Sequence, residues 1–142
     1  MEESIDLDAL RTSAAEFLAE ECGREAVLRH VAESSGPLLS LWEQVGDLGW
    51  PMLTVPEEHG GLGLGLAALV PLYEELGRVA APLPFLVTML ASDCIARSAS
   101  DEQKGQWLPR IAAGAIASPA LPLDPAPGAV QLRREGGDIV LS

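Results

Sequence analysis

The segment that decides the fold is Gly46 to Gly65, GDLGWPMLTVPEEHGGLGLG. Its glycines alternate with large apolar side chains, which are Leu48, Trp50, Leu53, Leu62 and Leu64. Glycine permits positive φ and lets two backbone segments approach where a side chain would clash. We therefore predict a loop that is itself packed, forming a structural crossover between two helical regions.

Helical periodicity lies on both sides of this loop. The apolar spacing predicts helices over residues 4–22, 25–33, 37–48, 66–77, 85–97 and 100–113. Ser4 or Asp6 is a suitable N-cap for the first, Pro37 a suitable first residue for the third, and Gly49 a suitable stop. The chain is therefore predicted to be mainly α-helical.

Three of these helices carry more specific predictions. Pro71 either kinks its helix or delays its start. Residues 85–97 are apolar nearly all round, which is typical of a helix in the middle of a bundle. Ser100 and Gln103 have capping-box spacing, and the helix that they open is expected to bury its apolar positions up to Gly114. Those positions are Trp107, Leu108 and Ile111.

The sequence changes character after residue 114. Four prolines fall within residues 115–128. Residues 129–133 and 139–141 then alternate like two strands around Glu135-Gly136-Gly137-Asp138, which predicts a β-hairpin. A lone hairpin is marginal in water, so we expect the remaining strands to come from further chain or from a partner.

Composition limits the classes of partner. The 21 acidic and 9 basic residues give a net charge of −12, which argues against nucleic acid and against an anionic membrane surface. Cys22 and Cys94 lack metal-ligand spacing and are expected to be reduced thiols, so no metal site is predicted. The acidic N-terminus has no signal-peptide pattern and the longest apolar run is interrupted, so a cytoplasmic setting is expected.

Several motifs in order resemble the N-terminal part of the acyl-CoA dehydrogenase family. They are Leu48-Gly49-Trp50 with Val55-Pro56-Glu57-Glu58-His59-Gly60-Gly61-Leu62-Gly63, Glu74-Glu75-Leu76-Gly77-Arg78, Asp101-Glu102-Gln103-Lys104 with Leu108-Pro109-Arg110-Ile111, and Ala112-Ala113-Gly114. The VPEEHGGLGL and YEELGR pair is the specific part. The resemblance covers about residues 5–142.

The resemblance implies a helical N-terminal domain, here residues 1–117, and the beginning of a middle β-domain, here residues 118–142. It also implies flavin adenine dinucleotide (FAD) and removal of two hydrogens from Cα and Cβ of an acyl-CoA thioester. A carboxylate base takes the α-proton, and donors hold the thioester oxygen. In the family that carboxylate lies in the C-terminal bundle, so no residue of this chain is assigned as catalytic.

The resemblance also places a flavin loop at the start of the β-domain. By position, the contacts fall on Leu121, Leu123 and Asp124, within Leu121-Pro122-Leu123-Asp124-Pro125. Leu123 stands where the family usually has a hydroxyl residue, and Pro122 lacks an amide donor. This departure from the pattern puts direct flavin binding by this chain in doubt.

An acyl-binding wall is the other implied site. In the family, the helix before the Asp-Glu-Gln-Lys element lines the fatty tail, which corresponds here to Leu83, Leu86, Val87 and Leu90. The same leucine and valine residues would be expected if they simply packed in the hydrophobic core.

Three functions follow from these observations. The first is part of an FAD-dependent acyl-CoA dehydrogenase, either an N-terminal fragment or a subunit in a homo- or hetero-oligomer with another chain of the family. In both forms FAD is bound mainly by a partner chain or by missing domains. The second is a non-catalytic assembly or scaffold subunit that keeps only the helical domain. The third is a small acyl-binding module, which requires the Leu/Val stripe to open toward solvent.

Overall fold

The computed structural model describes residues 6–33, 36–120, 132–135 and 138–141. The α-helices of this part of the chain are α1 (Leu7–Glu21), α2 (Arg24–Glu33), α3 (Leu39–Asp47), α4 (Val70–Arg78), α5 (Phe85–Ser98) and α6 (Asp101–Ala112). Short 3₁₀ turns are η1 (Trp50–Met52), η2 (Glu57–His59) and η3 (Leu66–Leu69). The strands are β1 (Leu132–Glu135) and β2 (Asp138–Leu141). The prediction of a mainly helical chain followed by the first strands of a β-region is confirmed.

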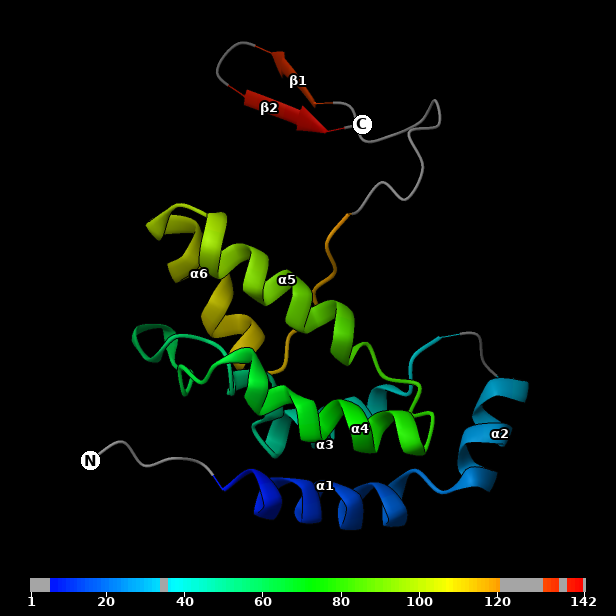
Figure 1. Cartoon of the computed structure of the whole chain (residues 1–142). Helices are drawn as coiled ribbons and strands as arrows, with labels where there is room; N and C mark the ends of the chain where they lie inside the picture. The colour runs from blue at the N-terminus through cyan, green and yellow to red at the C-terminus, as the bar shows by residue number, and fades with distance from the viewer. Residues whose placement is uncertain (1–5, 34–35, 121–131, 136–137, 142) are drawn as a thin grey trace.

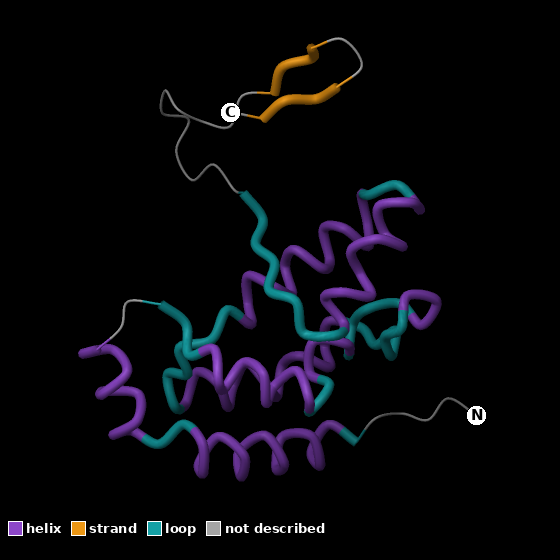
Figure 2. Tube along the Cα trace, turned by 180° about the vertical axis from the view of Figure 1, so that it is seen from behind, coloured by secondary structure: helices purple, strands orange, loops and turns teal. Residues whose placement is uncertain are grey.

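The helices pack as two groups around one core. α1 packs against α4 and α5 packs against α6 (Figure 1). Figure 2 shows from behind how the loop after α6 runs past α5 toward the C-terminus. This loop is tied to the helices, because the Trp42 Nε1 donates to the Gly114 carbonyl at 2.7 Å and the Ala117 amide to Thr88 Oγ1 at 3.4 Å.

Phe85 lies at the aromatic centre of the core. Its ring lies 5.5 Å from Tyr73, 6.2 Å from Trp50 and 6.4 Å from Trp42 between centroids, in tilted and edge-to-face arrangements that aromatic pairs prefer. The surrounding aliphatic residues of the core come from every α-helix except α2 and from η3, and include Leu18, Leu41, Val45, Leu69, Leu72, Met89 and Ile111. The residues around Phe85 therefore join the two groups of helices.

The glycine loop packs as predicted. The Leu62, Gly63 and Leu64 amides donate to the carbonyls of Met52, Val55 and Leu53 at 2.8–3.0 Å, so the loop closes on its own backbone. A Cβ at Gly61 would lie 2.0 Å from the Val55 carbonyl oxygen, a distance that no side chain tolerates. The close approach of two backbone segments is the reason for glycine at this position.

Most helix boundaries follow the predicted signals. Asp6 caps α1 by accepting hydrogen bonds from the Asp8 and Ala9 amides. Gly49 adopts a left-handed conformation with φ 74° beyond α3, and Ser100 and Gln103 form both bonds of the capping box. Pro71 delays its helix, because the preceding residues form η3 and α4 begins only at Val70.

Three details of the prediction are wrong. The third helix begins at Leu39, two residues after Pro37. Leu48 is 49% exposed, since it follows the last turn of α3. Trp107 is 44% exposed and stacks on the Arg110 guanidinium at 5.1 Å, because Leu108 and Ile111 take the inward face of α6.

The expectation that residues 85–97 lie in the middle of a bundle is also wrong. α5 buries one face, yet Leu86, Val87 and Leu90 on its other side are 56%, 38% and 43% exposed. α5 therefore lies at the edge of the described helices, with three of its aliphatic side chains uncovered there.

The predicted hairpin is present. β1 and β2 pair antiparallel, with Leu132 opposite Leu141 and Glu135 opposite Asp138. The first strand includes Glu135 and begins at Leu132, and residues 129–131 lie outside the described part of the chain.

Candidate functional site

The three exposed aliphatic residues of α5 form what we call the α5 stripe: Leu86, Val87 and Leu90. Leu86 and Leu90 are four residues apart and therefore lie one above the other on one face of the helix, with Val87 beside them. On the opposite side, Thr88 and Ser92 are only 0% and 2% exposed. α5 thus buries these two hydroxyl residues beside Phe85, Met89 and Ala91, and leaves the three aliphatic residues of the α5 stripe exposed.

The buried hydroxyl of Thr88 has a structural role. It accepts the Ala117 amide, which holds the chain leaving α6 against α5. Burying a hydroxyl is acceptable only when it is hydrogen-bonded. The orientation of α5, and with it the outward position of the α5 stripe, is therefore fixed by specific contacts on its inner face.

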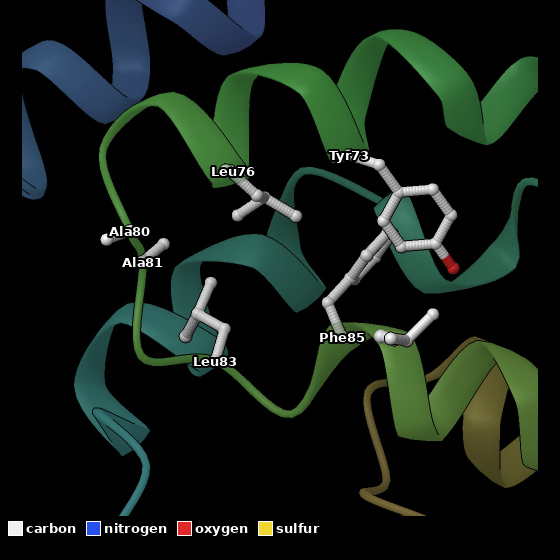
Figure 3. Close-up of a pocket in the computed structure, with 8 residues that line it drawn as sticks. Tyr73, Leu76, Ala80, Ala81, Leu83 and Phe85 are labelled. Carbon is white, nitrogen blue, oxygen red and sulfur yellow. The ribbon is translucent and has the colours of Figure 1, made fainter.

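A cavity of about 230 Å³ opens beside the N-terminal end of the α5 stripe. Its walls come from the end of α4, the following linker and the first turn of α5, with Tyr73, Leu76, Gly77, Ala80, Ala81, Leu83, Phe85 and Leu86 (Figure 3). No charged side chain lines it. Burial raises the pKa of Tyr73 above its ordinary value, so its hydroxyl stays protonated. The cavity is therefore lined by uncharged residues, with Tyr73 as the one polar side chain among them.

The resemblance to the family predicts two sets of site residues, and the structure describes only one of them. Leu83 and Leu86 both line the cavity, and the structure brings them together with Val87 and Leu90 along one side of α5. Their role toward an acyl group stays a prediction. Leu121, Leu123 and Asp124 lie outside the described residues.

Sequence reasoning did not single out Tyr73, Ala80 or Ala81. These residues lie in the second half of α4 and in the linker that leads to α5, the helix predicted to line the acyl tail. A search for small residues at that helix end would have found the two alanines.

The carboxylates nearest to this region are paired. Glu75 is 5% exposed and accepts bonds from Arg78 Nε and Nη2 at 3.0 and 3.3 Å, and this interaction raises the pKa of Arg78. Glu74 lies 2.6 Å from Arg11 Nη2. These guanidinium contacts occupy oxygens of both carboxylates. The uncharged lining of the cavity suits an apolar group.

Metal and membrane sites are not evident in the part of the chain that the structure describes. No cluster of three or more His, Cys, Asp or Glu suited to a metal ion occurs there. None of the helices in the same residues combines the length and apolarity needed to cross a bilayer.

Residues 4–115 match the family described as acyl-CoA dehydrogenase, N-terminal domain. The chain belongs to the acyl-CoA dehydrogenase family. It is 31% identical to acyl-CoA dehydrogenase FadE12 of Mycobacterium tuberculosis, in an alignment that covers 98% of this chain and 37% of FadE12.

Two solved structures share the fold. A variant of the steroid ACAD Tcur3481-Tcur3483 superposes with a TM-score of 0.81 at 31% identity, over 96% of this chain and 39% of that chain. The ChsE4-ChsE5 complex from Mycobacterium tuberculosis gives a TM-score of 0.70 at 27% identity, over 99% and 38%. The chain thus spans well under half of the length of these relatives.

Proposed function

We propose that this chain forms one wall of the acyl-binding site of a flavin-dependent acyl-CoA dehydrogenase. The observation that carries the proposal is the α5 stripe, which leaves Leu86, Val87 and Leu90 uncovered while Thr88 and Ser92 are buried. An acyl tail is uncharged hydrocarbon, and covering exposed aliphatic surface is favourable at about 25 cal/mol per Å². The chain's contribution is to bind and orient the tail and to exclude water from it.

The reaction proposed for the whole assembly is α,β-dehydrogenation of an acyl-CoA thioester. FAD, when bound, would supply the hydride acceptor, and a carboxylate on other polypeptide would take the α-proton. The side chains of Leu86, Val87 and Leu90 offer no hydrogen-bonding group to a flavin ring, and the Thr88 hydroxyl is turned inward to the Ala117 amide. We assign flavin binding mainly to a partner chain or to further domains.

A shared site with another chain of the family fits these features. The two structural relatives are titled as assemblies of two named components, Tcur3481 with Tcur3483 and ChsE4 with ChsE5. In this proposal residues 1–117 form the helical domain, residues 118–142 begin the β-domain, and a homo- or hetero-oligomer completes the site. The acyl-CoA is the substrate of that completed site.

A non-catalytic assembly subunit is the second candidate. It is favoured by the pairing of Glu74 with Arg11 and of Glu75 with Arg78, which gives both carboxylates a structural partner. In that case the α5 stripe is covered by protein instead of by an acyl tail. A small acyl-binding module is the third alternative, and it needs no partner.

Acyl-CoA binding by the purified protein, alone and co-expressed with a sister acyl-CoA dehydrogenase chain, tests the proposal. Leu86→Gln is expected to weaken octanoyl-CoA binding at least tenfold in calorimetry. Leu28→Gln on α2 is the matched control, since Leu28 is 58% exposed and Leu86 is 56% exposed.

Flavin colour separates the alternatives. Absorbance near 450 nm only with the sister chain supports the shared site, whereas binding without colour in either preparation supports the small module. Equal binding by both Leu→Gln variants, or none by the unmodified protein, overturns the acyl-binding role and leaves the assembly subunit.

A further inference from the structure

The chain that leaves α6 is held from two sides by buried side chains. The Trp42 Nε1 on α3 donates to the Gly114 carbonyl at 2.7 Å. The Ala117 amide donates to Thr88 Oγ1 on α5 at 3.4 Å. Trp42 and Thr88 are only 4% and 0% exposed. Residues 114–117, which we call the exit segment, are therefore bound to two helices that are distant from them in the sequence.

These two bonds are not needed to close the end of α6. The Gly114 and Ala115 amides already donate to the Ile111 and Arg110 carbonyls, both at 2.9 Å. Gly114 has φ 92°, the left-handed conformation with which many helices end. The additional bonds from α3 and α5 therefore fix the direction in which the exit segment leaves the helix.

Thr88 connects the exit segment to the α5 stripe. It lies between Val87 and Leu90 in the sequence, in the same turn of α5, but on the buried side of the helix. A helix is rigid over so short a distance, because main-chain hydrogen bonds join each turn to the next. The α5 stripe and the anchor of the exit segment are thus two sides of one rigid element.

We propose that Thr88 and Trp42 are positioning residues for the proposed dehydrogenation. They hold the exit segment so that residues 118–142 begin at a fixed distance from an acyl tail on the α5 stripe. The inference rests on the proposed function, in which residues 118–142 begin the β-domain and other polypeptide holds the hydride acceptor. Both side chains are buried and act through the exit segment, so neither is a catalytic residue.

Fixed spacing matters for this reaction because hydrogen leaves two adjacent carbons of the tail, and each must lie close to its own acceptor. Rates fall steeply when reacting groups are misplaced, by about 10²-fold for 1 Å. Losing the Thr88 hydroxyl frees the exit segment without removing any hydrocarbon from the α5 stripe. Turnover is therefore expected to fall while the affinity for the acyl group is kept.

Thr88→Val and Thr88→Ser in the full protein, co-expressed with a sister acyl-CoA dehydrogenase chain, test this role. Both variants disturb the buried site, since Thr88→Val replaces a hydroxyl by a methyl group and Thr88→Ser removes a methyl group. Thr88→Ser alone keeps an acceptor for the Ala117 amide. It is therefore the matched control for a general loss of packing.

Turnover of octanoyl-CoA with a soluble redox dye as electron acceptor gives kcat, and calorimetry gives the Kd. Thr88→Val is expected to lower kcat at least about tenfold and to change the Kd less than about twofold. Thr88→Ser should keep kcat within about threefold of the unmodified protein, because the hydrogen bond remains. Trp42→Phe removes the other bond while keeping an aromatic ring, and it should lower kcat with the Kd again unchanged.

Amide hydrogen exchange at Ala117 reports on the exit segment without any ligand. The exchange should be at least about tenfold faster in Thr88→Val than in the unmodified protein or Thr88→Ser, because a freed segment opens more readily. This measurement shows whether the bond holds the segment, and the kinetic constants show whether holding it matters for the reaction.

The outcomes separate this inference from the proposed function. An unchanged kcat in Thr88→Val, an equal loss of kcat in Thr88→Ser, or unchanged Ala117 exchange in Thr88→Val overturns the positioning role while acyl binding stands. Binding of octanoyl-CoA without turnover in the unmodified assembly also contradicts it, because no reaction then remains to be positioned. If octanoyl-CoA does not bind at all, the proposed function fails, and the inference fails with it.

Discussion

α1 and α5 both bury apolar side chains but differ in what they expose. α1 buries Ala14 and Leu18 and turns mainly polar and charged residues to the outside. α5 buries Phe85 and Met89 together with the hydroxyl residue Thr88, and leaves the α5 stripe exposed. The comparison teaches that burying one apolar face does not make the other face polar, and the exposed aliphatic side of α5 is the one to which we assign the acyl tail.

The largest expected effect separates the two faces of α5 itself. Phe85→Ala should lower the free energy of unfolding by about 3–5 kcal/mol, because it empties the space between Trp42, Trp50 and Tyr73. Leu86→Ala, one residue further along, should change it by less than about 0.5 kcal/mol. Urea unfolding of the full protein measures both.

Comparable losses in the free energy of unfolding for Phe85→Ala and Leu86→Ala would contradict this prediction. That result would mean that the side of α5 carrying Leu86 is already packed, and the basis of the acyl-binding proposal would go with it. A small loss for Phe85→Ala would instead show that the core collapses around the gap.

Much of the fold was predictable because its signals are local. Gly49 and the Ser100–Gln103 capping box act within a few residues, and so their helix ends were read correctly. The direction of a helix face is not local. Trp107 is predicted to be buried, but Leu108 and Ile111 occupy the buried face of α6. The sequence pattern alone does not determine which of two adjacent apolar residues faces the core.

The candidate site was predictable only in part for the same reason. The residues of the α5 stripe and Leu83 were named from the family pattern. The cavity beside them depends on how α4 ends, including the left-handed conformation of Ala80, and alanine gives no advance sign of it. The burial of Thr88 is likewise set by a partner 29 residues away in the chain.

A smaller loss of stability is expected when the buried threonine hydroxyl of α5 is removed, and it can be compared with removal of an exposed one on α1. Thr88→Val should cost about 1 kcal/mol, because the partly buried Ala117 amide loses its acceptor. Thr12→Val is the matched change on α1, where the exposed hydroxyl donates to the Asp8 carbonyl at 2.9 Å. This change should lower the free energy of unfolding by less than about 0.5 kcal/mol.

Chemical denaturation of the two variants in parallel measures the difference. Equal losses would show that the hydrogen bond from α5 to the loop after α6 does not stabilise the fold.

The smallest expected effect concerns the two thiols, one from each helix. Cys22 ends α1 and is buried, whereas Cys94 is exposed on α5. Burial raises the pKa of Cys22 above its ordinary value of 9.0, so the folded chain holds this proton more tightly than the unfolded chain. The stability that this pKa difference contributes is fully present below the pKa of Cys22 in the unfolded chain and is lost as pH rises through its pKa in the folded chain.

The free energy of unfolding should therefore fall above about pH 9, with a Cys22 contribution to the slope of at most about 1.4 kcal/mol per pH unit. Cys22→Ala should make this slope shallower. An unchanged slope in Cys22→Ala would show that this thiol is as accessible to water as the one on α5.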